Sequence, residues 1–104
     1  MDENYRKALG EVLLGKRQSA GLNKQQLALM IGANRLTIRR IEEGIANPTI
    51  GMLMRIAQGL EVSLADVFIE CERLLAESGN TTPIPPALEH PSDEPGISYY
   101  LTRM

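Results

Sequence analysis

The sequence predicts an all-α protein: a compact five-helix domain, followed by a proline-rich linker and a short strand-like tail. Apolar residues recur at helical spacing through residues 1–79. Residues that cap helix N-termini precede the second to fifth apolar segments, and glycines follow several of them. Between residues 80 and 96, five prolines exclude a helix interior, because proline lacks an amide donor. We therefore expect one domain over residues 1–79, with residues 80–104 as a linker and tail.

The first helix is expected from Tyr5 to Ala20, with Gly21 as its C-terminal stop. Gly10 and Gly15 each weaken it by roughly 1 kcal/mol relative to alanine. Its stability must therefore come largely from packing rather than from helix propensity. Its apolar stripe consists of Leu9, Val12 and Leu13.

The second helix is expected between Asn23 and Ile31. Asn23, followed three residues later by Gln26, forms the pattern of a capping box. After the helix, Gly32 permits the positive φ that a sharp turn to the next helix requires. The residues expected to face the core are Leu27, Ala28 and Ile31.

The third helix is short and mostly polar. Asn34 can cap it, it runs from about Arg35 to Glu43, and Gly44 ends it. Its inward apolar residues are Ile38 and Ile41, and at 100° per residue these two direct the other side toward solvent. The exposed side then carries Arg35, Leu36, Arg39 and Arg40.

Two further capping residues predict the last two helices. Thr49 follows Asn47-Pro48 and can open a helix through about Leu60. Ser63 and Asp66 form a second capping-box pattern, which opens a long helix ending near Ser78-Gly79. The apolar stripe of that last helix contains Leu64, Val67, Phe68, Cys71, Leu74 and Leu75.

Charge is distributed unevenly along the chain. A net charge of −2 argues against nucleic-acid binding, because phosphate contacts usually require basic residues. Residues 1–60, however, contain nine lysines and arginines against five acidic residues, a net charge of +4. Residues 61–104 contain two against eight, a net charge of −6. The two parts therefore suit partners of opposite charge.

The segment LNKQQLALMIGANRLTIRRIEEGIANPTI resembles the lambda-repressor-like (Cro/C1, or Xre) family of helix-turn-helix DNA-binding proteins. The resemblance extends from about Leu9 to Phe68. It implies a sequence-specific transcriptional regulator, most simply a repressor, in which one helix braces across the DNA backbone and the next lies in the major groove. The matching features are Leu27-Ala28, Ile31-Gly32, Thr37-Ile38, Ile41-Glu42-x-Gly44, Asn47-Pro48 and Val62-Ser63-Leu64.

The resemblance implies that residues at the start of the third helix read base edges. Arg35 is the first candidate, because arginine can contact guanine O6 and N7 together, which contributes about 1–3 kcal/mol of discrimination. Leu36 departs from the polar residue usual there and can pack only against apolar groups such as a thymine methyl. The alternative is an ordinary solvated helix face. The implied base-reading set is Asn34, Arg35, Leu36 and Thr37, with Arg39 and Arg40 further along the groove.

The resemblance also implies phosphate contacts and a structural ion pair. Asn23 and Lys24 begin the second helix, whose N-terminus suits a phosphate, and Lys24 replaces the usual glutamine. Asn47 is the remaining phosphate candidate, because Ile45 and Ala46 replace residues that are often basic. Arg17 and Glu42 match a partly buried ion pair of the family; the alternative is an exposed pair that contributes well under 1 kcal/mol.

Two functions compete for this chain. The first is a homodimer on a near-palindromic operator, with recognition helices roughly 34 Å apart. In the second, an antitoxin or adaptor, the acidic part from Glu70 to Met104 binds a basic protein partner. A third interpretation is the front part of a longer regulator. The expected dimer contacts are Leu74, Leu75, Tyr99, Tyr100 and Leu101.

No pattern for catalysis or metal binding is found in the sequence, and no cofactor is expected. A single cysteine excludes an internal disulfide, and His90 among nearby acidic residues lacks a fixed ligand geometry. No apolar run reaches the roughly 18–20 residues that span a bilayer, and the N-terminal residues lack the apolar core of a signal peptide. We therefore expect a cytoplasmic, non-enzymatic protein with double-stranded DNA as its partner.

Overall fold

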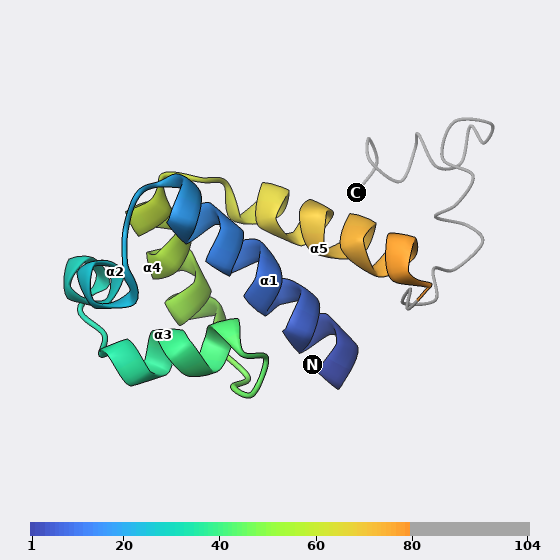
Figure 1. The fold of residues 1–104 in the computed structure, drawn as a ribbon, viewed down its shortest axis with the longest axis horizontal. Coiled ribbons are helices and arrows are strands. Elements are labelled where there is room, and N and C mark those ends of the chain that lie inside the picture. Colours follow the sequence, from blue (N-terminus) through green and yellow to red (C-terminus); the bar gives the residue numbers. More distant parts are fainter. Residues whose placement is uncertain (80–104) are drawn as a thin grey trace, which may run out of the picture.

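A computed structural model describes residues 1–79 and contains five α-helices within them, with no strand in that part of the chain. Their bounds are α1 (Glu3–Ser19), α2 (Lys24–Ile31), α3 (Arg35–Glu42), α4 (Ile50–Leu60) and α5 (Leu64–Ser78). In Figure 1, α2, α3 and α4 gather at one end of the molecule, while α1 and α5 run out toward the other. The all-α, five-helix prediction is confirmed. The expected linker and strand-like tail lie outside the described residues.

The core forms where α1 meets α3 and α5, and where α2 meets α3 and α4. Each large apolar side chain buried there contributes roughly 1.5–3 kcal/mol to folding. The inward-facing residues expected for α2 and α3 are all buried. No helix among residues 1–79 has the length and apolar character needed to cross a membrane. The largest fully buried side chains are Leu9, Leu27, Ile38, Leu53, Ile56, Val67 and Cys71.

Capping side chains set the starts of the helices. At Asn23 both bonds of the expected capping box are present, since its Oδ1 accepts the Gln26 N–H and the Gln26 side chain accepts the Asn23 N–H. At Ser63 only the first bond forms, with the Asp66 N–H donating to Oγ across 3.4 Å, so the second capping box was a wrong prediction. The first helix begins two residues earlier than expected because Asp2 caps it.

Gly10 allows α1 to approach α3 closely. A Cβ added at Gly10 would lie 2.4 Å from the carbonyl oxygen of Glu42 and 2.7 Å from that of Ile41. Both distances are shorter than any ordinary contact, so no larger residue fits without a shift of the backbone. Around Gly15, by contrast, nothing lies within 4 Å. The helix-weakening glycine at position 10 thus brings α3 against the body of the domain.

Candidate nucleic-acid interface

The turn between α2 and α3 fixes the position of α3. Gly32 adopts φ +71°, in the left-handed region that glycine favours. Arg55 of α4 donates from Nε to the Ile31 carbonyl and from Nη2 to the Gly32 carbonyl, both across 3.1 Å. It therefore satisfies carbonyls that the end of α2 leaves unpaired. The sequence offered one signal for this role: Arg55 is the only charged residue of α4.

The exposed side of α3 carries three arginines and a leucine. Ile38 and Ile41 are buried on its other side, as expected from the helical period. Leu36 is 54% exposed. Asn34 and Thr37 are engaged with each other, because both the backbone N–H and the hydroxyl of Thr37 donate to Asn34 Oδ1. The freely accessible residues of this face are Arg35, Leu36, Arg39 and Arg40.

Two adjoining hollows lie on either side of Arg35, with volumes of about 480 and 550 Å³. They bring the start of α2 and the exposed side of α3 onto one surface. Gln25 lines both hollows, although it is not among the residues that the sequence pattern predicts for this surface. The only feature of the sequence that could have indicated Gln25 is its position directly after Lys24, in the first turn of α2. The remaining lining residues are Arg17, Asn23 and Lys24 in the first hollow, and Asn34, Leu36 and Arg39 in the second.

Arg17 and Glu42 form a two-bond ion pair behind this surface. Arg17 Nε lies 2.7 Å from Glu42 Oε2, and Nη2 lies 3.0 Å from Oε1. The two side chains are 7% and 5% exposed. The third guanidinium nitrogen, Nη1, donates to the Leu22 carbonyl across 2.8 Å. The hydrogen bonds to Glu42 raise the pKa of Arg17, so its guanidinium stays charged at neutral pH.

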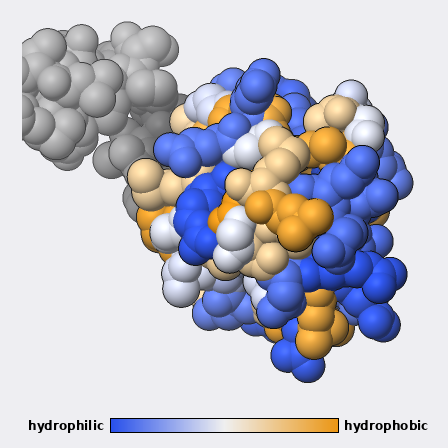
Figure 2. Space-filling view, turned by 90° about the vertical axis from the view of Figure 1, so that its left-hand side faces the viewer, coloured by the Kyte–Doolittle hydropathy of each residue, from blue (hydrophilic) through white to orange (hydrophobic). Residues whose placement is uncertain are grey.

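Figure 2 looks onto the end of the molecule that carries α2. Apolar side chains gather near the centre of this face, and hydrophilic side chains surround them. Exposed apolar residues occur on α2 and also on α4. They are Leu29 and Met30 on α2, and Ile50 and Met54 on α4. Such side chains cannot pair with phosphates, so any polar contact with DNA on this end must come from the residues around them.

Comparison with known proteins assigns the fold to a family. The family model HTH_3, described as helix-turn-helix, matches residues 15–67, about half of the chain, including α2, the turn and α3. The chain belongs to the HTH_3 helix-turn-helix family. The resemblance to Cro/C1-type proteins is therefore confirmed, and this HTH_3 protein is a DNA-binding transcriptional regulator.

Its relatives carry the names of transcriptional regulators and not of enzymes. An uncharacterized HTH-type transcriptional regulator of Haemophilus influenzae is 33% identical over 66 residues, 64% of this chain and 67% of the relative. The crystal structure of the clp gene regulator ClgR from Corynebacterium glutamicum matches with a TM-score of 0.70 and 27% identity, over 72% of this chain and 80% of that one. An HTH_3 family transcriptional regulator from Vibrio cholerae matches with a TM-score of 0.64 and 31% identity, over 74% of this chain and 43% of that one.

The phosphate candidates of this HTH_3 protein divide into two places. Asn23 and Lys24 lie at the N-terminus of α2, beside the ion pair, with Lys24 Nζ 3.9 Å from Glu42 Oε1. Asn47 is exposed in the loop after α3 and lines neither hollow. The candidate contacts to the DNA backbone therefore lie at two separate places, the N-terminus of α2 and the loop after α3.

The expected dimer contacts fall into three groups. Leu75 is only 4% exposed and belongs to the core of the single chain, so it is not available to a second copy. Leu74 is half-buried against that core. Tyr99, Tyr100 and Leu101 lie outside the described residues.

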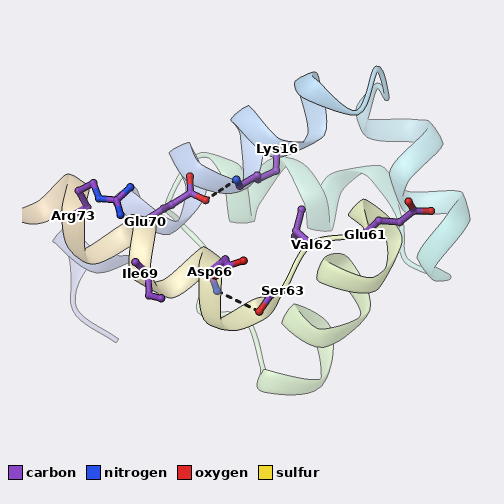
Figure 3. A pocket seen from close by; sticks show the side chains of 8 residues that line it. All are labelled: Lys16, Glu61, Val62, Ser63, Asp66, Ile69, Glu70 and Arg73. Atoms are coloured by element: carbon purple, nitrogen blue, oxygen red, sulfur yellow. Dashed lines mark hydrogen bonds and ion pairs between the residues drawn. The ribbon is translucent and has the colours of Figure 1, made fainter.

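A different part of α5 is open to solvent. A hollow of about 340 Å³ forms where α5 passes the end of α1 and the α4–α5 turn (Figure 3). Ile69 is 55% exposed at its edge, and Arg73 lies one turn further along α5. Lys16 and Glu70 form an ion pair of 2.6 Å across it. The other lining residues are Glu61, Val62, Ser63 and Asp66.

Proposed function

We propose that this regulator is a sequence-specific repressor that binds a near-palindromic operator as a homodimer, with α3 in the major groove. The observation that carries the proposal is the exposed side of α3, where three arginines and Leu36 stand over a buried anchor of Ile38 and Ile41. Residues 1–79 would be the DNA-binding domain, and residues 80–104 a linker and tail that include a further dimerisation segment.

The proposed contacts divide into base reading and positioning. Arg35 lines both hollows, which sets it between the α2 N-terminus and the rest of α3, and it is the main candidate for a guanine. Lys24 and Asn23 would hold one phosphate at the positive end of α2. Asn47 would meet the backbone beyond α3. Leu36, Arg39 and Arg40 complete the reading set, with Asn34 and Thr37 occupied mainly in capping.

Dimerisation is proposed because the contact set of one chain is small. After Gly44 the loop holds Ile45 and Ala46, neither of which pairs with a phosphate. A protein that neutralises few phosphates releases few counterions, so one chain alone is expected to bind weakly. Two chains on inverted half-sites one helical turn apart double the contacts.

The hollow on α5 is the proposed docking surface for the second copy within the described residues. It combines an exposed apolar residue, Ile69, with charges of both signs, Arg73 and Asp66. A two-fold interface places the same patch on both partners, so Arg73 of one copy can meet Asp66 of the other.

Selection of bound sites from random DNA tests the proposed function. At moderate salt, the full chain is expected to enrich a motif of two inverted half-sites whose centres lie about one helical turn apart. A single asymmetric half-site would contradict the dimer but keep specific recognition. If no motif emerges, specific DNA binding is the wrong function.

The second candidate is an antitoxin or adaptor, which the acidic residues 61–104 favour, with their net charge of −6. Deleting residues 80–104 separates the two functions. If the tail serves dimerisation, the truncated chain dimerises less and binds the operator more weakly. If the acidic part serves a protein partner, the truncated chain still binds DNA as a dimer but fails to retain a basic partner in a pull-down.

A further inference from the structure

One arginine of the reading face is held by a carboxylate. Arg39 Nε lies 3.1 Å from Glu43 Oε2, and the two side chains are 58% and 45% exposed. Glu43 is the C-cap residue directly after α3, four residues beyond Arg39, so its carboxylate lies about one helical turn further along the same face. Within residues 1–79 the only hydrogen bond from this guanidinium leaves from Nε. Its two terminal nitrogens remain available.

The position of this bond determines what Arg39 can still do. A guanidinium donates five N–H bonds in a rigid planar fork. A carboxylate on Nε occupies the side of the fork and leaves its end, formed by Nη1 and Nη2, free to donate. Two parallel N–H groups at that end match the O6 and N7 acceptors of guanine. The bond to Glu43 also restricts rotation of a long side chain before it meets the DNA, which lowers the entropy lost on binding.

We propose that Glu43 is a positioning residue that orients Arg39 for reading one guanine in each half-site. The inference rests on the proposed function, because it requires α3 to lie in the major groove. Arg35 and Arg40 have no carboxylate partner among the described residues. Of the three arginines on this face, Arg39 is therefore the one whose orientation is set in advance.

A second role for Glu43 makes a different prediction. A carboxylate near the DNA repels phosphates and so weakens binding to every sequence alike. Positioning of Arg39, in contrast, acts only where a guanine is read. Repulsion changes affinity without changing discrimination between bases, whereas positioning changes discrimination.

The test compares the full chain with its Glu43→Gln, Arg39→Ala and doubly substituted variants. Binding is measured by fluorescence anisotropy on three kinds of duplex: the selected operator, operators in which each guanine of the motif is replaced in turn, and an unrelated sequence. Glu77→Gln is the matched control, because it removes the same charge from the far end of α5 (Figure 1). Circular dichroism on each variant establishes that it is folded.

We expect Glu43→Gln to raise affinity for the unrelated duplex and to lower discrimination at one symmetric guanine by about two- to fivefold, the range that an exposed ion pair can supply. Arg39→Ala should lose discrimination at the same guanine, and adding Glu43→Gln to it should change discrimination no further. Glu77→Gln should leave discrimination unchanged.

Two results would overturn the inference separately from the proposed function. If wild-type protein selects an operator and Glu43→Gln raises all affinities equally with discrimination intact, Glu43 acts by repulsion alone. If the two variants lose discrimination at different bases, Glu43 does not act through Arg39. A wild-type chain without any preferred site would overturn the proposed function itself, and this inference with it.

Discussion

Arg17 of α1 and Glu42 of α3 form a two-bond ion pair that is almost fully buried. Glu42 is the last residue of α3, so the pair ties the reading helix to the first helix of the domain. The third guanidinium nitrogen of Arg17, Nη1, donates to the Leu22 carbonyl in the loop before α2. One side chain thus joins the three segments that set the geometry of the candidate DNA surface.

Removing one partner of this pair is expected to be costly. Arg17→Met should lower the free energy of unfolding by about 3–5 kcal/mol, because it leaves the Glu42 carboxylate buried without its counter-charge. Urea denaturation measures the change. Glu43→Gln, which breaks the exposed pair with Arg39, should change stability by less than about 1 kcal/mol. Equal effects of the two substitutions would mean that burial does not set the strength of the Arg17–Glu42 pair.

The two glycines of α1 should respond to alanine in opposite directions. Gly10→Ala should destabilise the domain by about 1–3 kcal/mol or more, because its Cβ would meet the backbone of α3 at 2.4 Å. Gly15→Ala should stabilise it by about 1 kcal/mol, since the position is open and helical. Thermal unfolding of both variants checks the pair. Stabilisation by Gly10→Ala would show that α1 and α3 do not approach this closely.

Most helix starts were predictable because capping is local. Asn23, Asn34 and Thr49 each lie three residues before the N–H that they accept, so the sequence pattern contains both partners. Asp2 is not predicted as the cap of α1, because the helical spacing of apolar residues becomes regular only further along this helix. At Ser63 the expected reciprocal bond is absent, since an acidic residue three positions later permits that bond but does not require it.

The rest of the candidate site depends on contacts between residues far apart in the sequence. Arg55 meets the end of α2 24 residues before it, and no periodicity predicts such a bond. The tight contact at Gly10 requires the path of α3, which the sequence of α1 alone does not contain. Leu75 is predicted at a dimer contact because the apolar stripe of α5 continues beyond the expected core, but α5 packs against α1 and Leu75 is buried in the core of the single chain. Packing, rather than local preference, decided each case.

The pKa of Cys71 predicts how stability depends on alkaline pH. Burial, followed by the nearby carboxylates of Glu70 and Glu72, raises the pKa of this thiol from 9.0 to about 12. Above about pH 9 the unfolded chain releases a proton that the folded chain keeps. The stabilising contribution of the Cys71 thiol to the free energy of unfolding is therefore fully present below about pH 9 and is lost as the pH rises toward 12. Cys71→Ala should show a smaller loss of stability over this interval, as measured by urea unfolding.

The same burial predicts a slow thiol reaction. At about pH 8 a disulfide reagent should label Cys71 only as fast as the protein opens, because the thiol is neutral and inaccessible in the folded state. Rapid labelling of the folded protein would contradict both the burial and the direction of the pKa shift.

Ile69 tests the proposed dimer surface. Ile69→Glu should weaken dimerisation by about tenfold or more, because it places a charge in the apolar part of the contact. Analytical ultracentrifugation measures the dissociation constant. Leu29→Glu is the control on α2, because Leu29 is an exposed apolar residue that does not line the hollow. A dimer that tolerates Ile69→Glu must form through another surface.

The central claim is that the exposed side of α3 reads DNA sequence, and Arg35, the first residue of α3, lines both hollows on that surface. Selection of bound sites from random DNA, carried out in parallel with wild type and Arg35→Ala, tests that claim most directly. We predict that the variant keeps the spacing of the two half-sites but loses its preference at one symmetric base pair, a loss equivalent to about 1–3 kcal/mol. An identical motif from both proteins would contradict the assignment of Arg35 as a base-reading residue.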